Sequence, residues 1–229
     1  MIAAVMSGPQ STCWTLIRAA AGGSPQQREE FARRYAPVLR AYLAARWRGS
    51  QLLQDVDDAV QDVFVECLRP GGALARLDPS RPGGFRAFLY GVARNVALRR
   101  ESRRPRPPSG DGPALDAIPD DHTSLSRVFD RAWAKAILRE AARLQDERAR
   151  ALGERARRRV ELLRLRFHQN LPIRDIARRW GVEAAALHHE YARAREEFRA
   201  ALLDVVAFHH AGAPDAAEEE CRKLLTLLG

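Results

Sequence analysis

The sequence lacks the features that would indicate a membrane protein or a disulfide-stabilised protein. Its three cysteines, Cys13, Cys67 and Cys221, lie far apart and form no CxxC pair, which argues against a disulfide framework and a cysteine-based zinc site. The longest uncharged stretch, Met1 to Ile17, contains several polar residues and has no basic start. We therefore expect neither a membrane-spanning helix nor a signal peptide, and we expect a cytoplasmic protein without membrane contacts.

Signals for strands and for catalysis are also missing. There are no alternating β-branched runs, and no glycine-rich phosphate loop follows a strand pattern. No Ser/His/Asp arrangement stands out, and the adjacent pairs His188–His189 and His209–His210 would point about 100° apart on a helix. We therefore expect no metal site, no cofactor and no enzymatic activity.

Positive charge is abundant and comes almost entirely from arginine. The 229 residues include 38 basic and 29 acidic side chains, for a net charge of +9, and only Lys135 and Lys223 are lysines. Arginine pairs with phosphates in a bidentate manner and stacks on bases, so the composition favours a polyanionic partner such as nucleic acid. On composition alone, an arginine-rich solvated surface remains the alternative.

Helical periodicity appears in every long segment, which predicts an all-α protein. Ser24 and Asp55 are predicted N-caps, with Gln27 closing a capping box after Ser24, and Cys67 falls on the apolar face of the helix that follows Asp55. The composition divides the chain into a helical domain over 1–100, a Pro/Gly-rich linker over 101–122, a second helical domain over 123–211 and an amphipathic tail over 212–229. In the tail, Cys221, Leu224, Leu225 and Leu228 share one face, and capping of the second domain is the favoured role over masking of a DNA or polymerase surface.

The segment from Ile173 to Tyr191 has the pattern of a helix-turn-helix unit. Apolar residues recur on one side of two short helices, and Gly181 stands where the chain must turn sharply. The second helix of such a unit lies in the DNA major groove. Glu183 and Glu190 are acidic on this helix, so each either faces away from DNA or accepts a hydrogen bond from a cytosine amino group.

Two motifs in order give the chain a resemblance to a known family. Leu171 to Arg195 resembles the promoter-reading domain of the extracytoplasmic-function (ECF) group of bacterial sigma factors, with Pro172 in place of the usual capping Ser or Thr. The segments Asp55 to Phe64 and Phe85 to Leu98 resemble the acidic helix of sigma region two and its partner helix. Segments beyond the minimal family plan, including the tail, resemble a subgroup of larger members.

The resemblance implies two helical domains, region two-like and region four-like, that bind core RNA polymerase, promoter duplex and melted promoter DNA. An anti-sigma protein or a Ser/Thr kinase is an implied regulator. The implied polymerase contacts are Asp57, Asp58, Gln61, Asp62 and Phe64. The implied contacts to melted DNA near position minus ten are Arg86, Tyr90, Arg94, Asn95, Arg99 and Arg103. The implied contacts to the minus thirty-five duplex are Ala184, Ala185, Ala186, His188, His189, Arg193 and Arg195.

Two other functions fit the same sequence. The chain would then be a helix-turn-helix regulator that acts without docking on polymerase, or a helical signalling adaptor whose positive charge is only surface. The acidic helix from Asp55 to Phe64 separates the first alternative from a sigma factor, and salt-dependent DNA affinity separates the second.

Overall fold

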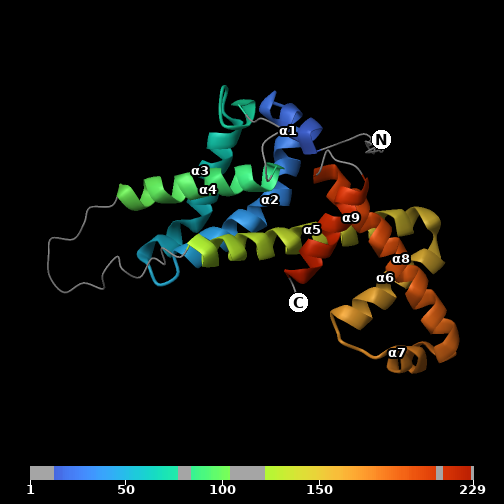
Figure 1. Ribbon diagram of the computed structural model, residues 1–229. Helices are drawn as coiled ribbons and strands as arrows, with labels where there is room; N and C mark the ends of the chain where they lie inside the picture. Colours follow the sequence, from blue (N-terminus) through green and yellow to red (C-terminus); the bar gives the residue numbers. More distant parts are fainter. Residues whose placement is uncertain (1–12, 77–83, 104–121, 210–213, 228–229) are drawn as a thin grey trace.

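The computed structural model describes residues 13–76, 84–103, 122–209 and 214–227, and within these ranges every regular element is helical (Figure 1). This confirms the all-α prediction. Most of the predicted linker, residues 104–121, lies outside the described residues. In the described part of the chain, no helix is both long enough and apolar enough to cross a bilayer. The helices are α1 (Cys13–Ala21), α2 (Pro25–Arg46), α3 (Val56–Leu68), α4 (Gly84–Ser102), α5 (His122–Leu152), α6 (Glu154–Phe167), α7 (Ile173–Trp180), α8 (Ala184–His209) and α9 (Pro214–Thr226), with short 3-10 turns η1 (Gln51–Asp55) and η2 (Leu74–Arg76).

The two helix starts predicted from capping residues occur where expected, but neither uses the predicted hydrogen bond. α2 begins at Pro25, whose fixed φ suits the first turn, and the Ser24 side chain makes no capping hydrogen bond. Its hydroxyl instead donates to the Gln26 Oε1 atom at 3.4 Å. Asp55 precedes α3 in the same way without a side-chain cap. The capping prediction was therefore wrong in mechanism, because proline geometry and tertiary packing suffice to start these helices.

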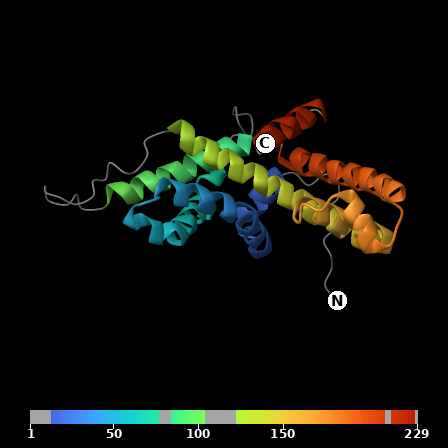
Figure 2. The same cartoon turned by 90° about the horizontal axis from the view of Figure 1, so that it is seen from below.

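One large hydrophobic cluster draws residues from both sides of the linker. Phe31 and Tyr35 from α2 belong to it together with Phe129 and Trp133 from α5 and Val206 from α8. The rings of Tyr35 and Trp133 stack with centroids 5.7 Å apart. α5 runs along the molecule and packs lengthwise against α2, as Figure 2 shows. The linker thus separates two stretches of sequence, while the apolar side chains on either side of it share one core.

A second, smaller cluster belongs to the helix-turn-helix segment alone. It is formed by one side of α6, by α7 and by the start of α8, which bury each other's apolar residues away from the main cluster. Its buried members are Leu162, Leu165, Ile173, Ile176, Ala177 and Leu187. The segment therefore has a core of its own, which holds α7 and α8 in a fixed relation.

α5 and α8 connect the small cluster to the large one. α8 contributes Leu187 to the small cluster and Val206 to the large one, so a single helix passes through both. The Gln145 side chain, buried on α5, donates from Nε2 to the carbonyl oxygen of Ala194 at 3.0 Å. Arg148 on α5 also pairs with Asp204 on α8 at 2.6 Å. These contacts hold the helix-turn-helix segment in position relative to the main body.

A buried carboxylate ties the two halves together. Glu140 on α5 is 9% exposed, and its carboxylate oxygens form ion pairs with the Nη2 atoms of Arg34 and Arg33 on α2, at 3.0 and 3.2 Å. Arg143, one turn further along α5, completes the group at 2.6 Å. Burial by itself would raise the pKa of Glu140, but the hydrogen bond from Arg143 and the charge of Arg34 lower it to about 2. Glu140 is therefore ionised at neutral pH and links the two halves.

The end of α8 is joined to α2 by a buried histidine. His209 is 8% exposed, and its Nδ1 atom lies 2.8 Å from the carbonyl oxygen of Val205. A carbonyl only accepts, so Nδ1 carries a proton. In the neutral ring, Nε2 then accepts from the Tyr35 hydroxyl, 3.1 Å away. This histidine fixes where α8 ends against α2.

α9 packs on the main cluster through one apolar face. Ala217, Cys221 and Leu224 are buried there, and α9 contacts both α8 and α5. Leu225, predicted to share this face, is 52% exposed, so that assignment was wrong: it lies about 100° around the helix from Leu224. Leu228 lies outside the described residues. α9 is therefore part of the main body in this structure.

Candidate nucleic-acid interface

α3 turns an acidic surface to solvent. Its apolar residues Val56, Ala59, Val60 and Val63 face the core at three- and four-residue spacing, and this leaves the opposite side exposed. The exposed side is the acidic face of α3, which we define as Asp57, Asp58, Gln61 and Asp62. Asp57 pairs with Arg40 at 2.7 Å and Asp62 with Arg100 at 2.6 Å, but both aspartates remain open to solvent. Four of the five residues predicted to contact polymerase thus lie together on one accessible surface.

The fifth predicted residue, Phe64, lies at the edge of the acidic face, where α3 meets the core. Its half-buried ring is in edge contact with Phe31, with centroids 5.8 Å apart. The apolar side chain that stands next to the acidic face is Val65, which is 64% exposed. The sequence reasoning missed Val65, although its four-residue spacing from Gln61 places it on the same helix side.

The beginning of α4 is engaged by the C-terminal half of the chain. Arg86, a predicted minus-ten residue, lies with Nη1 3.6 Å from Asp130 on α5 and 3.8 Å from Glu220 on α9. The ring of Tyr90 lies 5.2 Å from that of Phe129, with the rings in edge contact. These partners could not be predicted from the sequence, because contacts between residues 44 or 134 positions apart leave no local pattern.

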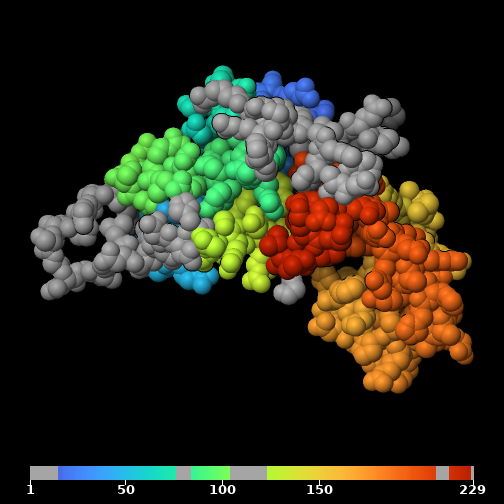
Figure 3. Space-filling view, viewed as in Figure 1, coloured from blue at the N-terminus to red at the C-terminus, as the bar shows by residue number. Residues whose placement is uncertain are grey.

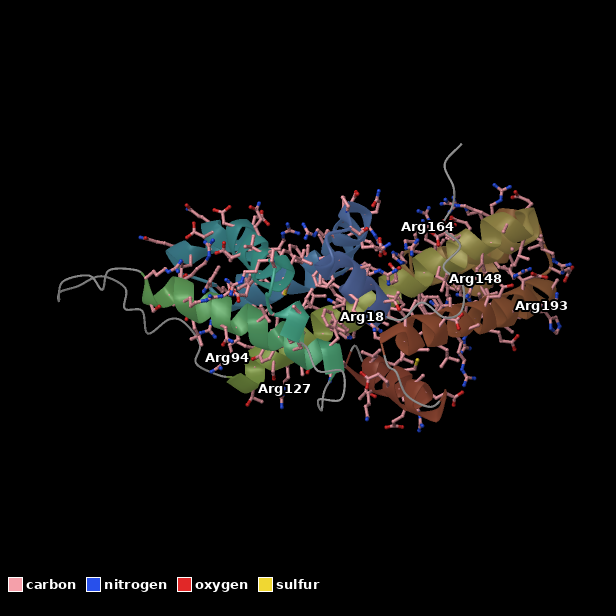
Figure 4. All side chains as sticks on the ribbon, turned by 90° about the horizontal axis from the view of Figure 1, so that it is seen from above. Arg18, Arg94, Arg127, Arg148, Arg164 and Arg193 are labelled. Atoms are coloured by element: carbon pink, nitrogen blue, oxygen red, sulfur yellow. The ribbon has the colours of Figure 1, made fainter. Side chains whose placement is uncertain are left out.

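The end of α4 is more open. Asn95, Arg99 and Arg103 are exposed. Arg99 pairs with Glu66 on α3 at 3.2 Å. Arg94 is half-buried, and Figure 4 places it on the side of α4 that faces the start of α5. Five of the six predicted minus-ten residues therefore lie along α4, and Arg103 directly follows its end; the earlier ones pack against other elements and the later ones are at the surface.

The turn predicted at Gly181 is confirmed. Gly181 has φ 62° and ψ 36°, the left-handed conformation that favours glycine, and its N–H donates to carbonyl groups at the end of α7. The N–H of Val182 also donates to the carbonyl oxygen of Ala177, at 3.1 Å. At the other end of α7, Pro172 is the N-cap and has no side-chain cap, as its ring requires. α7 and α8 thus form a helix-turn-helix unit.

The first turns of α8 present small residues and histidines to solvent. Only Leu187 is buried here, against α6 and α7. Arg193 lies toward the free end of the helix-turn-helix segment, as Figure 4 shows. The predicted minus thirty-five residues are all exposed, and they are Ala184, Ala185, Ala186, His188, His189, Arg193 and Arg195.

Glu190, by contrast, is held on the side of α8 that faces α6. Arg155 donates to it at 2.5 Å and Arg159 at 3.3 Å. These hydrogen bonds, with the Arg155 bond foremost, lower the pKa of Glu190. Arg158, in the same stretch of α6, lies over the Trp180 ring at 4.7 Å. Arginines of α6 therefore contact both helices of the helix-turn-helix unit on the side that faces α6. The carboxylate of Glu190 points to that side and away from the exposed side of α8.

The comparison with known families bears on the N-terminal half. Residues 31–106 match the family model described as Sigma-70 region 2. The matched range runs from Phe31 on α2 through α3 and α4, so it contains the acidic face and every predicted minus-ten residue. The helices α2 to α4 are therefore similar to region 2 of sigma-70 factors, which is consistent with a role in transcription initiation. No curated protein matched the chain.

Proposed function

We propose that the chain is a sigma factor of the ECF group, which binds core RNA polymerase, directs it to promoters and helps to melt them. In this proposal the acidic face of α3 contacts the polymerase, α4 contacts the non-template strand near position minus ten, and α8 reads the minus thirty-five element as duplex. The chain contributes no catalytic residue of its own and acts in the cytoplasm.

One observation carries the proposal: the region 2 match and a helix-turn-helix unit occur in one chain, in that order. The match covers α2 to α4 alone, and the unit made by α7 and α8 lies outside it. A second DNA-binding element is what a promoter with two separate elements requires, since each must be contacted at once. The exposed side of α8, with its small residues and histidines, suits direct contact with base edges in a major groove.

Charge reversal on the acidic face tests the contact with polymerase. Replacing Asp57, Asp58 and Asp62 together with arginine should abolish co-purification with core polymerase, because the basic face would repel the surface that it normally contacts. All three side chains are exposed, so the fold should survive, and circular dichroism together with thermal unfolding should show this.

The matched control carries the same charge change elsewhere. Glu29, Glu154 and Glu219 are exposed or half-exposed acids on α2, α6 and α9, and their replacement by arginine should leave polymerase binding intact. If the α3 variant still bound polymerase as tightly as this control, the chain would be a DNA-binding regulator or an adaptor. Run-off transcription with core polymerase on fragmented genomic DNA would then identify the promoters.

A further inference from the structure

The start of α4 is covered by acidic residues from the C-terminal half of the chain. The Arg86 guanidinium lies between Asp130 on α5 and Glu220 on α9, at 3.6 and 3.8 Å. The Glu220 side chain is only 14% exposed, whereas those of Arg86 and Asp130 are about a third exposed. An arginine predicted to contact promoter phosphates thus already has two carboxylates beside it.

α9 is positioned over this region by more than one contact. Its face of Ala217, Cys221 and Leu224 is buried against the main cluster. Arg131 on α5 donates from Nε to the carbonyl oxygen of Leu227 at 3.1 Å, just beyond the end of α9. Figure 3 shows α9 on the surface beside the first part of α5. Glu220 is therefore held near α4 by the docking of a whole helix.

The pKa of Asp130 responds to both Arg86 and Glu220. Burial raises the pKa of Asp130, the charge of Arg86 lowers it, and the neighbouring charge of Glu220 raises it again. A nucleic-acid phosphate would offer Arg86 a charge-assisted hydrogen bond, whereas the two carboxylates form only ion pairs with it, at 3.6 and 3.8 Å. A phosphate and the carboxylate pair therefore compete for one guanidinium.

We propose that α9, together with Asp130, is an internal acidic cover that occupies the DNA-contacting start of α4 in the free chain, and that nucleic acid displaces α9 from it. The proposal rests on the proposed function, because that function assigns Arg86 to melted DNA. Partly exposed ion pairs of this length contribute little each, so the cover weakens binding without preventing it. The apparent dissociation constant of the free chain equals the intrinsic constant divided by the fraction of uncovered molecules.

A double substitution that keeps side-chain shape tests the cover. Asp130→Asn with Glu220→Gln removes both carboxylates from Arg86, and the full-length variant should bind a fluorescent oligothymidylate about three- to tenfold more tightly than the unmodified chain. Fluorescence anisotropy at one fixed salt concentration measures this affinity.

The matched control makes the same charge change on the same two helices. Asp146 on α5 pairs with Arg150, and Glu219 on α9 pairs with Arg222, each within its own helix. Asp146→Asn with Glu219→Gln therefore changes the net charge equally but leaves Arg86 covered. Equal affinities for the two double variants would overturn the proposal, since net charge alone would then explain any gain.

Hydrogen exchange gives a readout of displacement that does not depend on charge. Amides of α9 should exchange faster when the unmodified chain is saturated with oligothymidylate, because the helix no longer packs on the main body. Unchanged exchange over 214–226 would overturn the proposal. Failure of the proposed function is seen separately: if the chain neither binds core polymerase nor supports transcription, that function fails, whereas an active holoenzyme with equal double variants refutes only the cover.

Discussion

Replacement of Glu140 by glutamine is the sharpest test of how the two halves are joined. This buried carboxylate receives Arg33 and Arg34 from α2 and Arg143 from α5. Its pKa of about 2, against an ordinary 4.5, corresponds to about 3 kcal/mol of stability at neutral pH. Solvent screens part of this, since the Arg33 and Arg143 side chains are 45% and 40% exposed. We therefore expect a loss of about 2 kcal/mol.

The measurement is urea unfolding of the full chain, supported by thermal unfolding. For a protein of this size, a loss of about 2 kcal/mol corresponds to a melting temperature lower by about 4–8 °C. The dependence on pH gives a second check. Because folding lowers the pKa of Glu140, its contribution is complete above pH 4.5 and is lost as the pH falls toward 2. The difference between the two proteins should therefore be smaller at about pH 3 than at about pH 7.

Glu147→Gln is the control for this prediction. Glu147 also pairs with Arg143 on α5, but its side chain is 49% exposed, so the change should lower stability by less than about 1 kcal/mol. Equal losses for Glu140→Gln and Glu147→Gln at neutral pH would refute the reasoning, because burial and the arginines of α2 would then make no difference.

Two further predictions concern the helix-turn-helix unit. Gly181→Ala should destabilise the protein by about 1–2 kcal/mol in urea unfolding, because φ is +62° and only backbone strain opposes the new methyl group. The control is Gly91→Ala in the middle of α4, where a new methyl group meets no neighbour, and it should stabilise the protein by about 0.5–1 kcal/mol. A Gly181→Ala variant as stable as the unmodified protein would contradict the left-handed turn. His188→Ala should weaken holoenzyme binding by about 1–3 kcal/mol on the cognate minus thirty-five sequence and by less on others. Arg193→Ala should weaken binding to all sequences alike, and competition binding assays would show the opposite pattern if Arg193 read bases.

Local pattern determined the helices and the turn. Apolar spacing in α3 puts Val63 on the buried side and Gln61, two positions earlier and about 200° around the helix, on the exposed side, and this follows from the helical period alone. The glycine at 181 marks a left-handed residue because no other residue adopts that conformation as easily. Cys67, predicted to be a core residue, is indeed buried, and burial raises the pKa of its thiol to about 12.

Tertiary contacts decided which predicted residues are accessible. The sequence placed Arg86 and Asn95 on one helix, but only packing makes Asn95 exposed and sets Arg86 between Asp130 and Glu220. The sequence also left open which way Glu190 points, and Arg155 on α6 decides it. In each case the deciding partner lies more than 30 positions away in the chain.

The sequence by itself thus determined the helical class, the order of the region 2 segment and the helix-turn-helix unit, and the acidic side of α3, because each depends on residues within a few turns of one another. The structure decided that α5 packs on α2 and that α9 lies against the main body, since both depend on side chains from distant helices meeting in one core. The buried Glu140 shows the physical reason: its charge is stable only where arginines of two helices converge on it, and no local pattern encodes that convergence.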